Sequence, residues 1–224
     1  MDNRRIVAIF GSPRRRGNTA RLLDQAVAGA REAGAEVETI VLRDLRLSPC
    51  MEIYSCRQDG ECRIRDDFQS VRDRVLACRG LMLASPIFYY AVTAHTKILM
   101  DRFHSLWVKR NWADSPPADS KKERRKGLFI SAGATRGRRL FEGALLSVRY
   151  FFDTLEMDLW KALLYRGLEY ENDVMQHHDY LLEAHQAGKE LAEAIGEGTL
   201  LRRRELFARL ARPVRISKQV HPLV

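Results

Sequence analysis

The chain has 224 residues, 46% of them hydrophobic, and a formal net charge of +9. A chain of this length buries a full core, and we expect one domain with an appendage. The first apolar run is very short, which predicts neither a signal peptide nor a transmembrane segment and so favours a cytoplasmic protein. Residues 121–126 carry a net charge of +4 and residues 200–224 a net charge of +6, which leaves a net charge of about −1 for the rest of the chain. Because the basicity is confined to a loop and a tail, we expect no nucleic acid as a partner.

Short apolar runs and helical patterns alternate along the chain. The runs predict strands at 5–10, 36–42, 80–84, 127–131 and 159–167, and the apolar spacing predicts helices at 19–33, 66–77, 91–108, 138–155 and 175–195. Parallel strands need crossover connections, and right-handed crossovers cover both faces of a sheet. The order therefore predicts an α/β fold with a doubly wound, five-stranded parallel sheet and helices on both faces. We assign residues 1–198 to this domain and 199–224 to a basic C-terminal extension with a short amphipathic helical pattern.

The segment between the first strand and the first helix, GSPRRRGNT at 11–19, has the features of a phosphate-binding loop. A helix N-terminus offers unpaired N–H groups and the positive end of the helix dipole, and glycines let the backbone approach an anion. Five residues separate the two glycines and Asn18 follows the second, which excludes a P-loop, and the pattern also lacks the three glycines of a dinucleotide fingerprint. A polar turn that only caps the helix is the alternative.

Two later strands end in segments that would lie at the same edge of the sheet. The third strand ends in SPIFYY at 85–90, whose aromatic residues suit a flat heteroaromatic ring. The fourth ends in SAGAT at 131–135, whose small residues let a ring lie against the backbone. An isolated aromatic stripe would be assigned to the core, but three compatible loops at one edge favour a ligand site.

Three stretches resemble the NADPH-dependent FMN reductase group of the flavodoxin-like superfamily, and especially its iron-sulfur flavoprotein relatives. They are GSPRRRGNT at 11–19, the segment from SPC at 48–50 to DD at 66–67, and SPIFYYAVTAHTKILMDR at 85–102. The resemblance covers residues 5–195 and implies a flavodoxin-like fold, FMN, NAD(P)H as electron donor, and a homodimer or homotetramer whose neighbouring loops help to cover the flavin. It assigns the FMN phosphate to Ser12, Arg14, Gly17, Asn18 and Thr19, and the flavin ring to Pro86, Ile87, Phe88 and Tyr89, closed in by Gly133 and Ala134.

The chemistry implied by this resemblance needs no dedicated acid or base, because the flavin accepts hydride on its own ring. We therefore assign no catalytic residue. His95 and His104 are single histidines in a helical pattern, where a surface or packing role is the commoner one. Asp101 and Arg102 are equally compatible with a pair at a helix end and with a functional pair.

The cysteines depart from the pattern of the iron-sulfur relatives, which carry four closely spaced cysteines after the second strand. Cys50, Cys56 and Cys62 match the first, third and fourth positions, but Ile53 stands at the second. A cubane cluster takes four thiolates and Ile is no ligand, so we expect no iron-sulfur cluster and no other metal. Free thiols, or a redox pair such as Cys50 with Cys56, are the alternatives, and Cys78 precedes a core strand as a small buried hydrophobe.

Three functions from different classes fit these features. We favour an FMN-dependent NAD(P)H oxidoreductase that acts on a small acceptor such as a quinone, an azo compound or a flavin. The alternatives are a flavin electron carrier that serves a redox-protein partner, and a regulatory protein that keeps the fold and uses its basic tail. For the tail itself, packing within the protein's own oligomer is favoured over docking on acidic lipid.

Overall fold

The computed structural model of the protein describes residues 4–112 and 124–196. This part of the chain contains one sheet of five parallel strands in the order β2-β1-β3-β4-β5. The order reverses direction at β1, which places a topological switch point between β1 and β3. The predicted doubly wound parallel sheet is therefore confirmed. The strands are β1 (Arg5–Phe10), β2 (Glu36–Val41), β3 (Gly80–Ala84), β4 (Arg125–Gly133) and β5 (Met157–Arg166).

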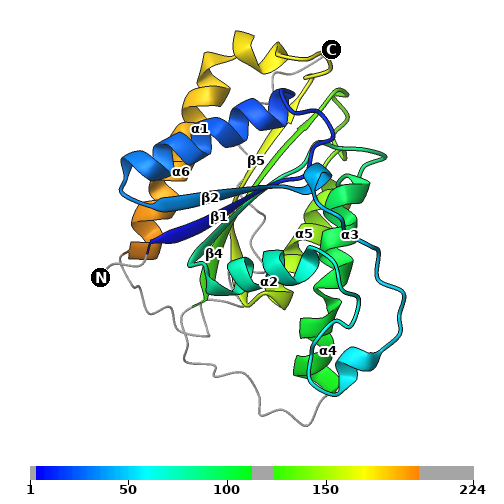
Figure 1. Ribbon diagram of the computed structural model, residues 1–224. Coiled ribbons are helices and arrows are strands. Elements are labelled where there is room, and N and C mark those ends of the chain that lie inside the picture. Colours follow the sequence, from blue (N-terminus) through cyan, green and yellow to red (C-terminus); the bar gives the residue numbers. More distant parts are fainter. Residues whose placement is uncertain (1–3, 113–123, 197–224) are drawn as a thin grey trace.

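Six α-helices in the described ranges cover the two faces of the sheet (Figure 1). Two of them, α1 and α6, share one apolar layer, and the others lie on the opposite side. Successive strand residues point into opposite layers, as Ile6 and Val7 of β1 do, because side chains alternate along a strand. The helices are α1 (Asn18–Glu32), α2 (Phe68–Ala77), α3 (Ala94–Arg102), α4 (His104–Trp112), α5 (Glu142–Thr154) and α6 (His178–Gly196).

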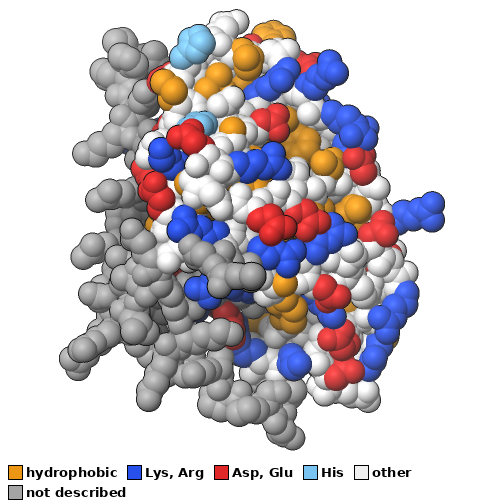
Figure 2. Space-filling view, turned by 60° about the vertical axis from the view of Figure 1, so that its left-hand side comes forward, with side chains coloured by type: hydrophobic (Ala, Val, Ile, Leu, Met, Phe, Trp, Pro, Cys, Tyr) orange, Lys and Arg blue, Asp and Glu red, His pale blue; other side chains and the backbone are white. Residues whose placement is uncertain are grey.

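Two glycines allow α1 and α6 to cross in close contact. A Cβ atom added at Gly29 would lie 2.0 Å from the carbonyl oxygen of His185, and one at Gly188 would lie 1.8 Å from that of Ala26. No side chain fits at either position without separating the helices. The outer surface on this side of the molecule carries interspersed acidic and basic side chains rather than one basic patch (Figure 2). It includes the pair Lys189 with Glu32, 3.0 Å apart.

The predicted helix over 91–108 is two helices, α3 and α4. Residues 88 and 91 are paired in a turn, so the first helix, α3, begins only after Thr93. The Thr93 hydroxyl caps this helix by accepting a hydrogen bond from the N–H of Thr96. The break between the helices falls at Phe103, which is fully buried between the rings of Phe68 and Phe151 at 5.1 and 5.5 Å. The tertiary packing of this ring was not apparent in the helical pattern of the sequence.

Strand β4 begins two residues earlier than predicted, at Arg125. A charged residue fits there because its guanidinium donates hydrogen bonds to the carbonyls of Val75 and Cys78, at 2.7 and 3.1 Å, and to that of Leu155 at 2.5 Å. The last residues of the predicted polar insert at 111–126 therefore belong to the strand. Most of this insert lies outside the described residues, and so does the predicted extension at 199–224. No helix in the described ranges has the length and apolar character needed to cross a membrane.

Candidate functional site

The loop at 11–17 leads from β1 into α1, at the carboxyl edge of the sheet where the loops after β3 and β4 also emerge (Figure 1). Gly17 is the N-cap of α1 in extended conformation, and its carbonyl accepts the first N–H groups of the helix. The Ser12 hydroxyl accepts a hydrogen bond from the N–H of Arg14 at 3.1 Å. Within the described structure, the N–H groups of residues 15–19 have no hydrogen-bond partner. These donors and the helix dipole form a cradle for an anion.

The three arginines of this loop differ in their surroundings. Arg15 forms an ion pair with Asp44 at 2.6 Å, and Arg43 donates to the carbonyl of Pro13, so the loop is held against the end of β2. Arg14 and Arg16 are exposed and have no ion-pair partner in the part of the chain that the structure describes. Arg14 is thus available to an anion, which is compatible with the role that the resemblance implies for it.

The side chain of Asn18 hydrogen-bonds to the protein itself, whereas the resemblance assigns it to the FMN phosphate. Its amide nitrogen donates to the carbonyl of Tyr170 at 2.9 Å, and its amide oxygen accepts the N–H of Val174 at 3.1 Å. The side chain therefore ties the start of α1 to the loop after β5, and only the backbone N–H of Asn18 is left for the cradle. Thr19 and Ser12 are buried at 2% and 3% exposure, which places them inside the loop rather than on its rim.

The aromatic segment after β3 forms a tight two-residue turn. Phe88 and Ala91 exchange both backbone hydrogen bonds at 2.9 Å, and the residues between them, Tyr89 and Tyr90, have φ angles of 49° and 61°. Left-handed φ angles at two bulky residues are strained and mark a segment held by its surroundings. The turn keeps its rings out of the core: Tyr89 is fully exposed and Phe88 and Tyr90 are half-exposed, whereas Pro86 and Ile87 lie partly buried at its base.

Buried hydroxyl groups lock the three loops together. Thr93 donates to the carbonyl of Gly11 at 2.5 Å, and its own N–H donates to Ser85 at 3.1 Å. Ser131 donates to the carbonyl of Ser85 at 2.7 Å, which joins β4 to the same network. A Cβ added at Gly11 would lie 2.0 Å from the Thr96 hydroxyl, so only glycine allows β1 and α3 to approach this closely. The sequence pattern does not indicate this role of the threonines, although a threonine such as Thr93 directly before a helix is a capping signal.

The third loop meets the second through Gly133. A Cβ at this position would lie 2.9 Å from Leu140 and 3.4 Å from Ile87, so the glycine makes room for both side chains. Gly133 is buried and Ala134 is exposed. The arrangement fits the two halves of FMN: a cradle of free N–H groups suits the phosphate, and the aromatic turn beside exposed backbone suits the ring.

A buried ion pair fixes the segment that carries three of the cysteines. Arg102, at the end of α3, is 1% exposed and donates to the Asp66 carboxylate at 2.6 Å and to the carbonyls of Ser48 and Ile64 at 2.9 Å. Burial alone would raise the pKa of Asp66, but the bonds from Arg102 and from the N–H groups of Ser48 and Phe68 hold that pKa below its usual value. Arg102 is therefore a structural anchor, and Asp101 pairs separately with Lys97 at 2.6 Å.

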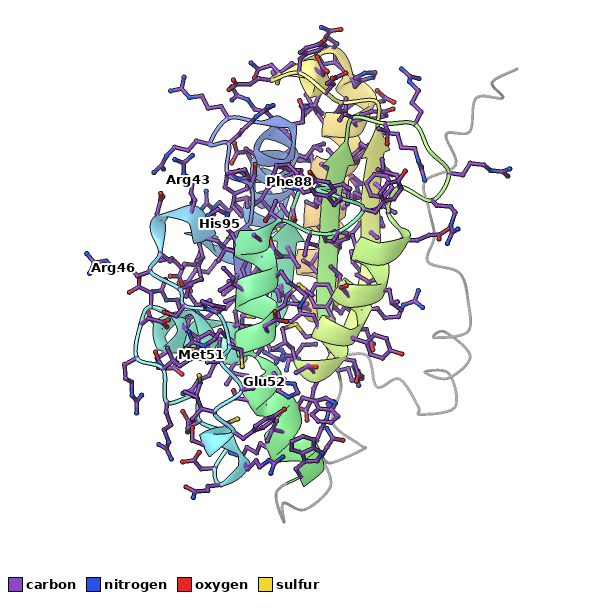
Figure 3. All side chains as sticks on the ribbon, turned by 90° about the vertical axis from the view of Figure 1, so that its right-hand side faces the viewer. Arg43, Arg46, Met51, Glu52, Phe88 and His95 are labelled. Atoms are coloured by element: carbon purple, nitrogen blue, oxygen red, sulfur yellow. The ribbon has the colours of Figure 1, made fainter. Side chains whose placement is uncertain are left out.

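The cysteine segment does not offer the ligands of a four-thiolate cluster. Burial raises the pKa of the Cys56 thiol, and Cys62 and Cys50 contribute in the same direction. Ile53, however, holds the second ligand position with its side chain 60% exposed, and the described residues contain no group of three or more acidic, His or Cys side chains placed to hold a metal. The segment also lies apart from the aromatic turn: Figure 3 shows Met51 and Glu52 of the segment well away from Phe88 of the turn. Three thiols with Ile53 at the second position thus do not complete the four-thiolate set of a cubane cluster.

Comparisons with known proteins identify the family of the chain. The sequence pattern of the NADPH-dependent FMN reductase family matches residues 4–157. An iron-sulfur flavoprotein of Methanocaldococcus jannaschii is 37% identical over 46% of this chain and 54% of its own length. A putative NAD(P)H-dependent FMN-containing oxidoreductase of Bacillus subtilis is 30% identical over 44% of this chain and 51% of its own. These matches thus span about half of each curated relative.

Among solved structures, the NAD(P)H:quinone oxidoreductase from Methanothermobacter marburgensis is similar over 84% of this chain and 95% of its own, with a TM-score of 0.62 and 18% identity. At this identity the likeness concerns the fold, and it confirms the flavodoxin-like architecture predicted from the sequence. The family match covers well over half of the chain and includes the cradle, the cysteine segment and the aromatic turn. The chain belongs to the NADPH-dependent FMN reductase family.

Proposed function

We propose that the protein is an FMN-dependent NAD(P)H oxidoreductase that passes electrons to a small acceptor such as a quinone, an azo compound or a free flavin. The observation that carries the proposal is the joining of the N–H cradle at 15–19 to the exposed aromatic turn at 88–91 through the hydroxyls of Thr93 and Thr96. Membership of the FMN reductase family supports the cofactor, and the Bacillus relative supports the donor. Bound FMN would supply the redox chemistry, because its ring accepts hydride directly.

The residues of the chain would bind and orient the cofactor. The N–H groups at 15–19 and the Arg14 guanidinium would hold the phosphate dianion, with Ser12 keeping the loop in shape. The turn at 88–91 would support the ring on one side, and its strained backbone, fixed by Thr93, would limit the ring's movement. Asn18 would act on the site indirectly, through the loop after β5.

We also propose that the protein works as a homodimer or homotetramer in the cytoplasm. A groove of about 610 Å³ lies between α3, α5 and the cysteine segment, and it is lined by Met100, Trp107 and Tyr150 among others. Leu146 and Tyr150 on α5 and Met51 are more than half exposed beside it, which suits burial against a second copy. The four cysteines are free thiols, which suits a reducing compartment.

The test is anaerobic reduction of the FMN-loaded protein. We expect NADPH or NADH to bleach the flavin absorption, and a small quinone such as menadione to restore it over many turnovers. Bleaching without turnover on quinone, azo dye or free flavin, combined with rapid electron exchange with a ferredoxin or flavodoxin, would replace the enzyme with an electron carrier. Failure of purified protein to take up FMN would refute both functions.

A further inference from the structure

The guanidinium of Arg102 has one hydrogen-bond donor that finds no acceptor in the described structure. Its terminal nitrogens donate to the Asp66 carboxylate at 2.6 Å and to the carbonyls of Ser48 and Ile64, each at 2.9 Å. The side chain has no exposed surface, and its Nε atom has no partner. Buried donors in native proteins are almost always paired, so an unpaired one marks a position for a further acceptor.

The thiol of Cys62 lies against the same guanidinium. Burial alone would lower the pKa of Arg102, but hydrogen bonds to Asp66 and to the Cys62 thiol raise it. A thiol sulfur is a weak acceptor, so it does little for a buried cation. Cys62 packs against the apolar layer that contains Phe68 and Phe103, and it is only partly buried. The residue is therefore fixed beside the cation and still within reach of a small molecule from the solvent.

The other three cysteines have different surroundings. Cys78 also neighbours a guanidinium, that of Arg125, which donates to its carbonyl at 3.1 Å, but Cys78 is 2% exposed. Burial raises the pKa of the Cys78 and Cys56 thiols, which makes both less nucleophilic at neutral pH. Cys50 lines the groove of about 610 Å³, whose lining among the described residues includes no arginine. Partial exposure together with contact to a buried guanidinium thus distinguishes Cys62.

We propose that Cys62 is a site of reversible oxidation by hydrogen peroxide, and that the free Nε–H of Arg102 binds the oxygen that this reaction adds. The sulfur attacks one peroxide oxygen, the O–O bond breaks, and the thiol proton leaves with the other oxygen as water. The product is a sulfenic acid, whose oxygen is a better acceptor than a bare sulfur. Two molecules of a thiol such as glutathione return it to Cys62, with release of water and of their disulfide.

The test maps the oxidised site by mass spectrometry on the full chain loaded with FMN. Reduced protein is treated with about one equivalent of hydrogen peroxide while dimedone traps sulfenic acid as a stable thioether. Trypsin places Cys62 on the peptide 58–63, Cys78 on 75–79, and Cys50 with Cys56 on 47–57, so their adducts are measured separately. We expect at least about tenfold more adduct on 58–63 than on either other peptide, because a hydrogen bond from a charged group is worth about tenfold or more.

Arg102→Lys tests the donor, because lysine keeps the charge but lacks the Nε–H group. It should lower the adduct on 58–63 about tenfold. Arg63→Lys is the matched control, since Arg63 directly follows Cys62 but pairs with Asp59 at 2.6 Å, and lysine keeps the tryptic site. The control should leave the adduct within about twofold of the parent value. Circular dichroism of both variants checks that they are folded.

The parent protein alone can overturn the inference. Adduct spread evenly over the three peptides, or found mainly on 47–57 or 75–79, would do so even if Arg102→Lys fails to fold. A folded Arg102→Lys protein with unchanged adduct on 58–63 would also overturn it. Glutathione added before dimedone should remove the adduct, and an adduct that persists would refute the reversibility of the oxidation. None of these outcomes depends on the proposed flavin function, since the cysteine segment lies apart from the aromatic turn.

Discussion

The buried pair Arg102 with Asp66 gives the sharpest prediction for stability. In Asp66→Asn one carboxylate oxygen becomes an amide nitrogen, which cannot accept. Either the oxygen that serves Arg102 and the Ser48 N–H, at 2.6 and 2.8 Å, is lost, or the oxygen that accepts the Phe68 N–H at 3.0 Å is lost. The Arg102 side chain has no exposed surface, so its charge is left buried without a carboxylate. Removing one partner of such a pair destabilises a protein by about 3–5 kcal/mol, and we expect the lower end because two carbonyls still bind Arg102.

Urea unfolding followed by circular dichroism measures this loss of unfolding free energy. The matched control is Asp101→Asn on the same helix, whose pair with Lys97 is about half exposed and should contribute less than about 0.5 kcal/mol. A loss below about 1 kcal/mol in Asp66→Asn, at an unchanged m-value, would refute the argument from burial.

The pH dependence of the same pair follows from the direction of the shift. The pKa of Asp66 is lower in the folded protein than its usual value near 3.8, so its contribution is fully present above that pH and is lost as the pH falls through the folded pKa. The difference in unfolding free energy between the parent protein and Asp66→Asn should therefore be constant above about pH 5 and shrink below about pH 4. A difference that grows in acid would contradict the assignment.

Three further substitutions test other parts of the account. Gly11→Ala should weaken FMN binding at least about tenfold in a fluorescence titration, because the added methyl group meets Thr96 and separates the two loops; an unchanged Kd would show that the loops do not act together. Gly188→Ala should lower the unfolding free energy by about 1–3 kcal/mol in urea, since the new Cβ meets a backbone carbonyl of α1, and a neutral effect would contradict the close crossing of α1 and α6. Ile53→Cys completes the four-cysteine spacing, so the variant should bind more iron and sulfide than the parent protein after anaerobic reconstitution. Colorimetric assays and absorption near about 400 nm measure this content. Equal iron in both proteins would show that Ile53 is not what prevents ligation.

The sequence predicted the elements whose patterns are local. The strand from Arg5 to Phe10 is buried along nearly its whole length, and its apolar letters indicated this directly. Glycines and small polar residues between a strand and a helix are also a local pattern, and this pattern predicts the loop at 11–19. Arg14 lies in this loop and Thr19 in the first turn of α1, and their contact with FMN stays a prediction.

Other features depend on contacts between distant residues and leave no local pattern. The split of the helix at Phe103 follows from rings contributed by α2 and α5. The engagement of Asn18 by the loop after β5 joins residues more than 150 positions apart. The sequence pattern offers Asp101 as a partner of Arg102, because the carboxylate that Arg102 binds, that of Asp66, lies in another segment. Tertiary contacts of this kind override local propensity.

The central claim is that the loop at 11–19 binds the phosphate of FMN. The most direct test is titration of the flavin-free protein with FMN and with riboflavin, which lacks that phosphate, while the quenching of flavin fluorescence is followed. The free N–H groups at 15–19 and Arg14 predict that FMN binds at least about a hundredfold more tightly than riboflavin, and that Arg14→Gln narrows this gap. Equal affinity for the two flavins would contradict the account.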